Sequence, residues 1–124
     1  MHLRQTHGHT NQTWQESKTD VGTGAKLIRV DYSNKESIKK ALTGVDVVIS
    51  TLAIAAIDVQ PGIAEAAKEA GVKLFVPSEF GGPTEGETEG FFGAKAIIQE
   101  RLKAIGIPYA LFYTGPFADF IWVP

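Results

Sequence analysis

Three times along this chain, a stretch with helical spacing ends at a glycine that is followed at once by Val or Ile and an apolar run. These joints are Gly44-Val45, Gly71-Val72 and Gly106-Ile107. Glycine is favoured just after a helix because it adopts a left-handed backbone conformation without strain. Helices that alternate with apolar strands form right-handed βαβ units, so the recurrence predicts an α/β fold with a parallel sheet and flanking helices.

Apolar periodicity places the individual elements of this fold. Strands are expected at 27–32, 45–51, 72–76 and 107–113, and helices at 34–43, 60–70 and 93–105. The last three strands are expected to lie side by side and parallel, in chain order. The near-continuous apolar run of the 45–51 strand is typical of a strand covered on both faces. Ser33 and Glu36 have the spacing of a capping box at the start of the first helix.

Composition narrows the classes of function. Hydrophobic residues make up 44% of the chain and charged residues 21%, which is typical of a soluble globular protein. The net charge of −2 argues against nucleic acid as a partner. No apolar run has membrane-spanning length, and no apolar segment near the N-terminus resembles a secretory signal. With no cysteine, disulfides and thiolate metal sites are excluded, and a cytoplasmic location is expected.

The first 24 residues differ in composition from the rest. They are polar, lack periodicity and carry His2, His7 and His9. Three histidines could form a metal site, but no structured carboxylate context surrounds them. The expectation is therefore a disordered leader over 1–24 and no metal site, with the folded part over 25–124.

The residues with the strongest functional signal follow the 72–76 strand, as the run Pro77-Ser78-Glu79-Phe80-Gly81-Gly82. In open α/β sheets, ligands bind at the carboxyl ends of the strands. An ordinary loop at a strand end is the alternative on position alone. The acidic loop that comes next, 84–90, lacks the ligand pattern of a calcium loop and is expected to be solvated and mobile.

Several segments then resemble, in order, one branch of the atypical short-chain dehydrogenases, the NmrA-like and isoflavone-reductase-like proteins. They are Val30-Asp31-Tyr32, the run from Gly44 to Thr51, the run from Pro77 to Gly81, Lys95 after Phe92, and Gly106 to Tyr109. The resemblance covers about residue 25 to the end. It implies a partial Rossmann-type domain that binds NADP(H), and a reductase of small, possibly aromatic, substrates.

The resemblance also implies a set of site residues. The cofactor would be bound by residues after two strands and by one helical lysine: Thr51, Leu52, Ala53, Pro77, Ser78, Glu79, Phe80 and Lys95. Lys95 would also act in acid/base chemistry, because a lysine in a partly closed pocket can have its pKa lowered by desolvation. The alternative for Lys95 is a surface lysine on an amphipathic helix. We expect its ammonium to face Ser78 and Glu79.

The chain departs from the family pattern in several ways. Phe91 stands where ordinary short-chain dehydrogenases have a tyrosine, and a phenyl ring has no proton to donate. Gly115 stands where reductases of this group often have asparagine. The Gly-rich turn that holds the pyrophosphate, the first strands and the substrate-binding region are not recognisable. The chain is therefore expected to be an internal part of a larger domain, with weak NADP(H) binding and no activity on its own.

Three functions remain open on this evidence: an NADPH-dependent reductase, a dinucleotide-sensing regulator without turnover, and an inactive fragment. In a full-length form the expected partner is a small-molecule substrate. The Rossmann strand order 3-2-1-4-5-6 would place strands one and two between 27–32 and 45–51. We therefore expect 27–32 to rearrange beside 45–51, and an exposed edge at 45–49 to promote self-association.

Overall fold

The computed structural model describes residues 2–5 and 24–116, which form an α/β fold with parallel strands and three α-helices. The element bounds are β1 His2–Gln5, β2 Leu27–Val30, α1 Lys35–Ala41, β3 Val47–Ile49, α2 Gln60–Glu69, β4 Leu74–Val76 and α3 Gly90–Ile105. A short 3₁₀ helix that the sequence pattern did not predict, η1 over Ile54–Val59, precedes α2. The predicted fold class is confirmed.

The central pair of strands is β3 and β4, which run parallel with Val47 opposite Leu74 and Ile49 opposite Val76. The chain after α3 lies on the other side of β4, where Tyr109 forms a parallel bridge with Phe75. The predicted order of the three runs is therefore confirmed. The 107–113 run pairs only through that bridge rather than as a strand, and further along the Gly115 amide bonds to the Gly81 carbonyl instead.

A second parallel pair corrects two expectations. β1 pairs with β2, from His2 opposite Leu27 to Gln5 opposite Val30. Residues 2–5 are thus a strand rather than part of a disordered leader, and β2 does not rearrange beside β3. The physical reason is that the expectation assumed that β2 lacks a partner strand, and β1 supplies one. Most of the proposed leader, residue 1 and residues 6–23 with His7 and His9, lies outside the described residues, and so does the side chain of His2.

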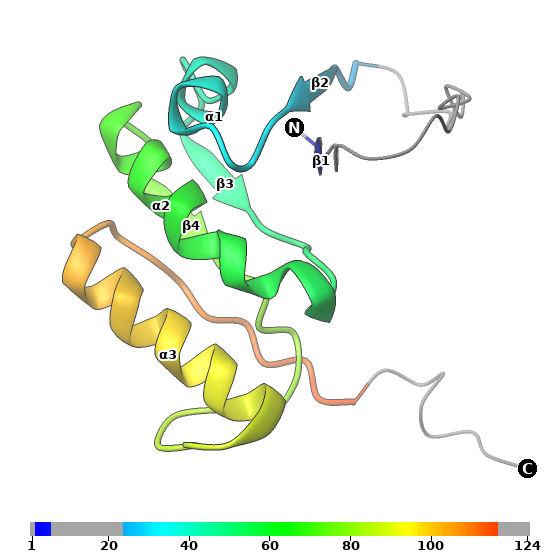
Figure 1. The fold of residues 1–124 in the computed structure, drawn as a ribbon, viewed down its shortest axis with the longest axis vertical. Coiled ribbons are helices and arrows are strands. Elements are labelled where there is room, and N and C mark those ends of the chain that lie inside the picture. Colours follow the sequence, from blue (N-terminus) through cyan, green and yellow to red (C-terminus); the bar gives the residue numbers. More distant parts are fainter. Residues whose placement is uncertain (1, 6–23, 117–124) are drawn as a thin grey trace, which may run out of the picture.

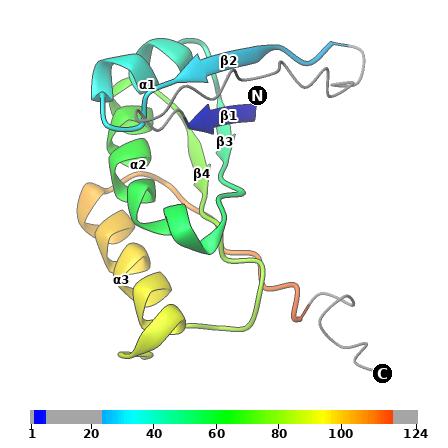
Figure 2. The ribbon, with the colours of Figure 1, turned by 45° about the vertical axis from the view of Figure 1, so that its right-hand side comes forward.

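The helices all lie on the same side of the strands, with α2 between α1 and α3 (Figures 1 and 2). Their inward faces meet the strands in one core, in which Phe75, Leu42 and Leu102 are completely buried. Ala66 and Ala67 are also completely buried, and their small side chains let α2 pack closely. No helix in the described part of the chain is long and apolar enough to cross a membrane.

β3 is covered on one face only, which corrects the expectation of a strand covered on both. Val48 points toward the helices and is 8% exposed, whereas Val47 and Ile49 are 45% and 61% exposed. Successive side chains of a strand point to opposite faces, so this alternation marks an uncovered apolar face. The near-continuous apolar sequence did not reveal it, because both faces carry the same residue types.

The start of α1 also differs from the prediction. The N-cap is Asn34, whose side-chain oxygen accepts from the Ser37 amide at 3.1 Å. The Ser33 hydroxyl instead donates to Asp31 at 2.7 Å, so no capping box forms with Glu36. The glycine joints behave as predicted: Gly71 and Gly106 have φ angles of 85° and 70°, the left-handed region that ends α2 and α3.

Candidate functional site

Two loops at the carboxyl ends of β3 and β4 are joined through Ser78. Its hydroxyl donates to the Leu52 carbonyl at 2.9 Å, and its amide donates to the side-chain oxygen of Gln60 at 2.7 Å. Gln60 is the first residue of α2 and is 1% exposed. These bonds cross-link both loops and the start of α2 into one edge, which is the ligand-binding position in open α/β sheets.

The predicted cofactor-binding residues lie in these two loops. Thr51 and Ala53 are exposed, while Leu52 is half-buried and tied to Ser78. Pro77 is completely buried, and Phe80 has a positive φ of 28°. That conformation is strained for a bulky residue, and such strain clusters at functional sites. The structure thus brings the 51–53 and 77–80 segments together, and their binding of a cofactor stays a prediction.

Lys95 points inward from α3 and contacts Glu79 in two ways. Its ammonium donates to the Glu79 backbone carbonyl and lies 3.9 Å from carboxylate oxygen Oε2 of the same residue. The Lys95 side chain is 6% exposed, and its nitrogen lies 4.6 Å from the centre of the Phe91 ring. Lys95 is therefore not a surface lysine. It faces Glu79 as predicted, whereas the Ser78 hydroxyl bonds to the Leu52 carbonyl.

The surroundings of Lys95 act on its amine in opposite directions. Burial lowers the pKa of Lys95, and the Glu79 carboxylate raises it by a smaller amount. Burial in a poorly solvated site disfavours the charged form of a lysine, and a nearby negative charge favours it. A lysine with a lowered pKa is better matched to proton transfer near neutral pH.

Gly81 lies in contact with this amine. A Cβ atom built on Gly81 would lie 3.6 Å from the Lys95 nitrogen and 3.4 Å from the Glu79 carbonyl oxygen. The Gly81 carbonyl accepts from the Gly115 amide at 3.2 Å, which ties the loop to the last described segment. Gly81 therefore packs directly against the Lys95 amine and the Glu79 backbone.

Two buried polar residues, Thr84 and Gln99, were missed by the sequence analysis. Gln99 donates to Glu79 Oε1 at 3.1 Å and to the Thr84 hydroxyl at 2.7 Å. Exposed fractions are 0% for Thr84, 2% for Glu79 and 4% for Gln99. The 84–90 loop was expected to be solvated, and this is wrong at Thr84, although residues 85–90 are exposed. The available signal was the i, i+4 spacing of Lys95 and Gln99, which places them on one helix face.

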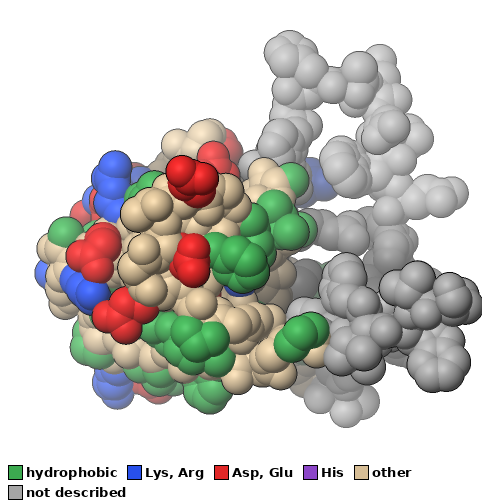
Figure 3. Space-filling view, turned by 90° about the horizontal axis from the view of Figure 1, so that it is seen from below, with side chains coloured by type: hydrophobic (Ala, Val, Ile, Leu, Met, Phe, Trp, Pro, Cys, Tyr) green, Lys and Arg blue, Asp and Glu red, His purple; other side chains and the backbone are tan. Residues whose placement is uncertain are grey.

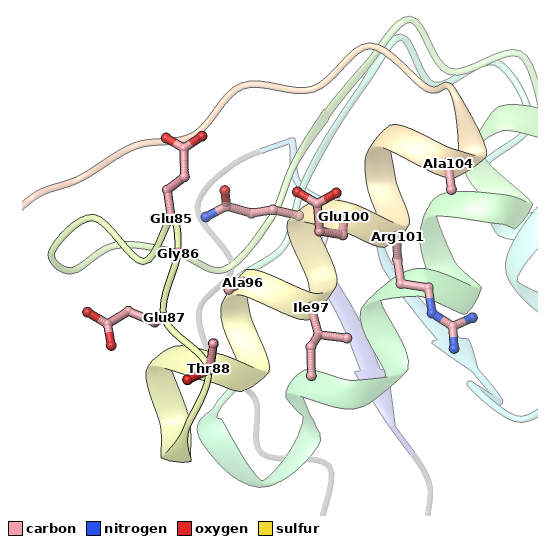
Figure 4. Close-up of a pocket in the computed structure, with 10 residues that line it drawn as sticks. Glu85, Gly86, Glu87, Thr88, Ala96, Ile97, Glu100, Arg101 and Ala104 are labelled. Atoms are coloured by element: carbon pink, nitrogen blue, oxygen red, sulfur yellow. The ribbon is translucent and has the colours of Figure 1, made fainter.

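A separate groove of about 440 Å³ lies on the outer side of α3. Figure 4 shows it between the 85–88 loop and the helix, with Glu85 and Glu100 beside it and Ile97 along the helix. Figure 3 looks at the molecule from below, where acidic and hydrophobic side chains lie close together on the surface. Lys95 does not line this groove, but Gln99, which bonds to Glu79 and Thr84, does.

The sequence matches the model of the NmrA-like family over residues 3–122. The chain belongs to the NmrA-like family. It is 41% identical over 103 residues to an isoflavone reductase homologue of Nicotiana tabacum, covering 78% of this chain and 33% of that protein. It is 35% identical over 104 residues to a phenylcoumaran benzylic ether reductase of Pinus taeda, covering 79% and 34%.

Solved structures agree with this family assignment. The structure of AtPrR2 with NADP+ and (+)-pinoresinol matches with a TM-score of 0.71 and 33% identity, over 79% of this NmrA-like chain and 35% of that one. The chain thus spans about a third of the length of the relatives it matches. Its parallel strands and helices match one segment of these longer proteins.

Proposed function

We propose that this NmrA-like chain forms the nicotinamide-side segment of an NADP(H)-dependent reductase that acts on a small aromatic substrate. The observation that carries the proposal is the buried Lys95 ammonium at the carboxyl edge of the sheet, beside the side-chain-free Gly81. The relatives support it, since they include an isoflavone reductase homologue and a phenylcoumaran benzylic ether reductase.

The residues present fit such a cofactor at one end. The exposed Thr51 and Ala53 and the 77–80 loop would flank it, with Lys95 beside Gly81 at the same edge of the sheet. NADPH supplies a hydride when it is bound. Lys95 holds or releases a proton at its nitrogen, and its lowered pKa suits that role. Phe91 presents its ring to the Lys95 ammonium rather than a hydroxyl proton.

Steady-state kinetics test the proposal in a full-length form of the protein. NADPH oxidation is followed with a panel of aromatic ketones and enones, for the wild type and Lys95→Ala. We expect kcat to fall by about 10²–10⁴-fold, the usual contribution of a general acid or base, with a smaller change in the KM for NADPH. A loss confined to NADPH affinity would assign Lys95 to binding rather than to proton transfer.

The same assay separates the other candidate functions. NADPH binding without turnover of any substrate would favour a dinucleotide-sensing regulator, and neither binding nor turnover would favour an inactive protein. Titration calorimetry of NADPH into the 124-residue chain addresses its own affinity. We expect weak binding, because the sequence has no recognisable Gly-rich turn whose backbone amides would hold the pyrophosphate. Micromolar affinity would overturn that expectation.

We further propose that copies of the chain associate through the exposed edge of β3. In its ladder with β4, the Ser50 amide donates to the Val76 carbonyl and the Asp46 carbonyl accepts from Leu74. Because alternate residues of a parallel strand bond to opposite neighbours, the backbone groups of Val47 and Ile49 face away from β4. Such an edge favours pairing with another chain. Separately, we propose that the protein is located in the cytoplasm, and cell fractionation tests this.

A further inference from the structure

We infer that Thr84 and Gln99 are positioning residues for Lys95: they hold the Glu79 carboxylate beside the ammonium, so that Glu79 keeps the amine charged and in place. The inference rests on the proposed function, because it concerns residues that act through Lys95. The four side chains come from three segments: the loop after β4, the start of the acidic loop, and α3. Each of them is at least nine-tenths buried.

The arrangement begins with the geometry of α3. Lys95 and Gln99 are four residues apart, so both project from the same face of the helix. The Lys95 ammonium donates to the backbone carbonyl of Glu79, and the Gln99 side-chain amide donates to the carboxylate oxygen Oε1 of Glu79 at 3.1 Å. One helix face therefore fixes both ends of Glu79, and the second carboxylate oxygen, Oε2, is left 3.9 Å from the Lys95 nitrogen.

Thr84 fixes the orientation of Gln99. The Gln99 amide nitrogen donates to the Thr84 hydroxyl oxygen at 2.7 Å as well as to Glu79. The reverse orientation of the Gln99 amide would turn its oxygen toward the carboxylate, which is repulsive. Since the Thr84 oxygen accepts from Gln99, its own proton is directed to the Glu79 carboxylate, whose oxygens lie 3.4 and 3.5 Å away.

Because these side chains are buried, the position of the Glu79 carboxylate strongly affects the Lys95 amine. The Glu79 carboxylate is 2% exposed, and Gln99 and Thr84 are neutral hydrogen-bond donors that hold it in place. Among residues 24–116, Lys95 is the cation within 4.0 Å of the Glu79 carboxylate, and Glu79 is the charged group that faces Lys95 from the packed loop. Loss of either neutral donor frees the Glu79 carboxylate to move away from the Lys95 nitrogen, which weakens its stabilisation of the charged amine.

The first test follows the titration of the Lys95 amine by NMR, in the 124-residue chain with isotope-labelled lysine. Glu79→Gln, Thr84→Val and Gln99→Met are each expected to move the Lys95 midpoint to lower pH. Thr84→Ser keeps the hydroxyl and should restore the wild-type midpoint. Glu100→Gln changes an exposed carboxylate next to Gln99 and serves as the matched control, with no shift expected.

An unmoved or raised Lys95 midpoint in folded Thr84→Val would overturn the inference. Thr84→Val keeps the branching at Cβ and removes only the hydroxyl, so it carries the test if Gln99→Met fails to fold. The second readout is the pH dependence of kcat in a full-length form, whose Lys95 limb should shift in the same direction in Thr84→Val and recover in Thr84→Ser. If no NADPH-dependent turnover exists, the proposed function fails while the NMR titration still decides the inference.

Discussion

The side-chain oxygen of Gln60 accepts the Ser78 amide hydrogen at 2.7 Å, which ties the first turn of α2 to the loop after β4. Replacing Gln60 by Met keeps the length of the side chain but leaves the Ser78 amide without this acceptor. A donor that loses its partner in a half-buried site destabilises a protein by about 1–3 kcal/mol. Urea denaturation should show a lower free energy of unfolding of that size.

The control for this prediction is Asp58→Asn, an exposed position in η1 just before Gln60. It should change the free energy of unfolding by less than about 0.5 kcal/mol, as is usual for surface substitutions. Equal stability of Gln60→Met and the wild type would mean that another group takes over the Ser78 amide.

Replacing two helical glycines by alanine should change the stability of the protein in opposite directions. A Cβ on Gly93 would lie 2.7 Å from the backbone carbon of Thr88 and 2.9 Å from its oxygen, whereas a Cβ on Gly62 meets nothing within 4 Å. Gly93→Ala must therefore displace backbone, at a cost of about 1–3 kcal/mol. Gly62→Ala should stabilise α2 by about 0.5–1 kcal/mol through helix propensity. Thermal denaturation should show a lower melting temperature for Gly93→Ala and a higher one for Gly62→Ala. A stabilised Gly93→Ala variant would contradict the close packing of Gly93 against Thr88.

The sequence predicted those parts of the fold that depend on local patterns. Gly71 and Gly106 end their helices, and the alanine-rich stripe of α2 is buried, because both features are determined within a few residues. The cap of α1 was placed one residue early, since Ser33 and Asn34 are both good capping residues. β1 was not recognised, because its sequence His-Leu-Arg-Gln carries one apolar residue.

The candidate site was predicted in part. The position of Lys95 and of the 77–80 loop followed from the family resemblance and from the rule for parallel strand ends. Gln60, Thr84 and Gln99 were not predicted, because a polar residue is expected at the surface until its buried partner is known. Those partners lie 15 to 20 residues away in the sequence, so only the packed structure identifies them.

The uncovered face of β3 predicts how the protein behaves in concentrated solution. Ile49→Lys places a charge on this exposed apolar face and should reduce association between copies, because edge lysines disfavour strand pairing. Ile97→Lys is the matched control, since Ile97 is 62% exposed on α3, compared with 61% for Ile49. Sedimentation velocity over a concentration series should show weaker association for Ile49→Lys only. Equal effects of both variants would indicate non-specific hydrophobic association rather than association through β3.

Stability at alkaline pH should reveal the balance of forces on Lys95. Burial lowers the pKa of Lys95 in the folded protein below its ordinary value of 10.5, despite the opposing effect of Glu79. Below the folded pKa the amine is charged in both states, so the cost of burying it is fully present. As the pH rises through the folded pKa toward 10.5, the unfolded chain binds more protons than the folded one, and the free energy of unfolding increases.

The reference for this measurement is the double variant Lys95→Met, Glu79→Gln, which removes the buried pair and leaves no lone buried charge. Burial raises the pKa of Tyr32, which titrates in the same alkaline range but is present in both proteins. Urea denaturation at a series of pH values should show the wild type gaining stability relative to the double variant as the pH rises. A loss of relative stability would mean that the Glu79 charge outweighs burial and that the Lys95 pKa is raised, not lowered, in the folded protein.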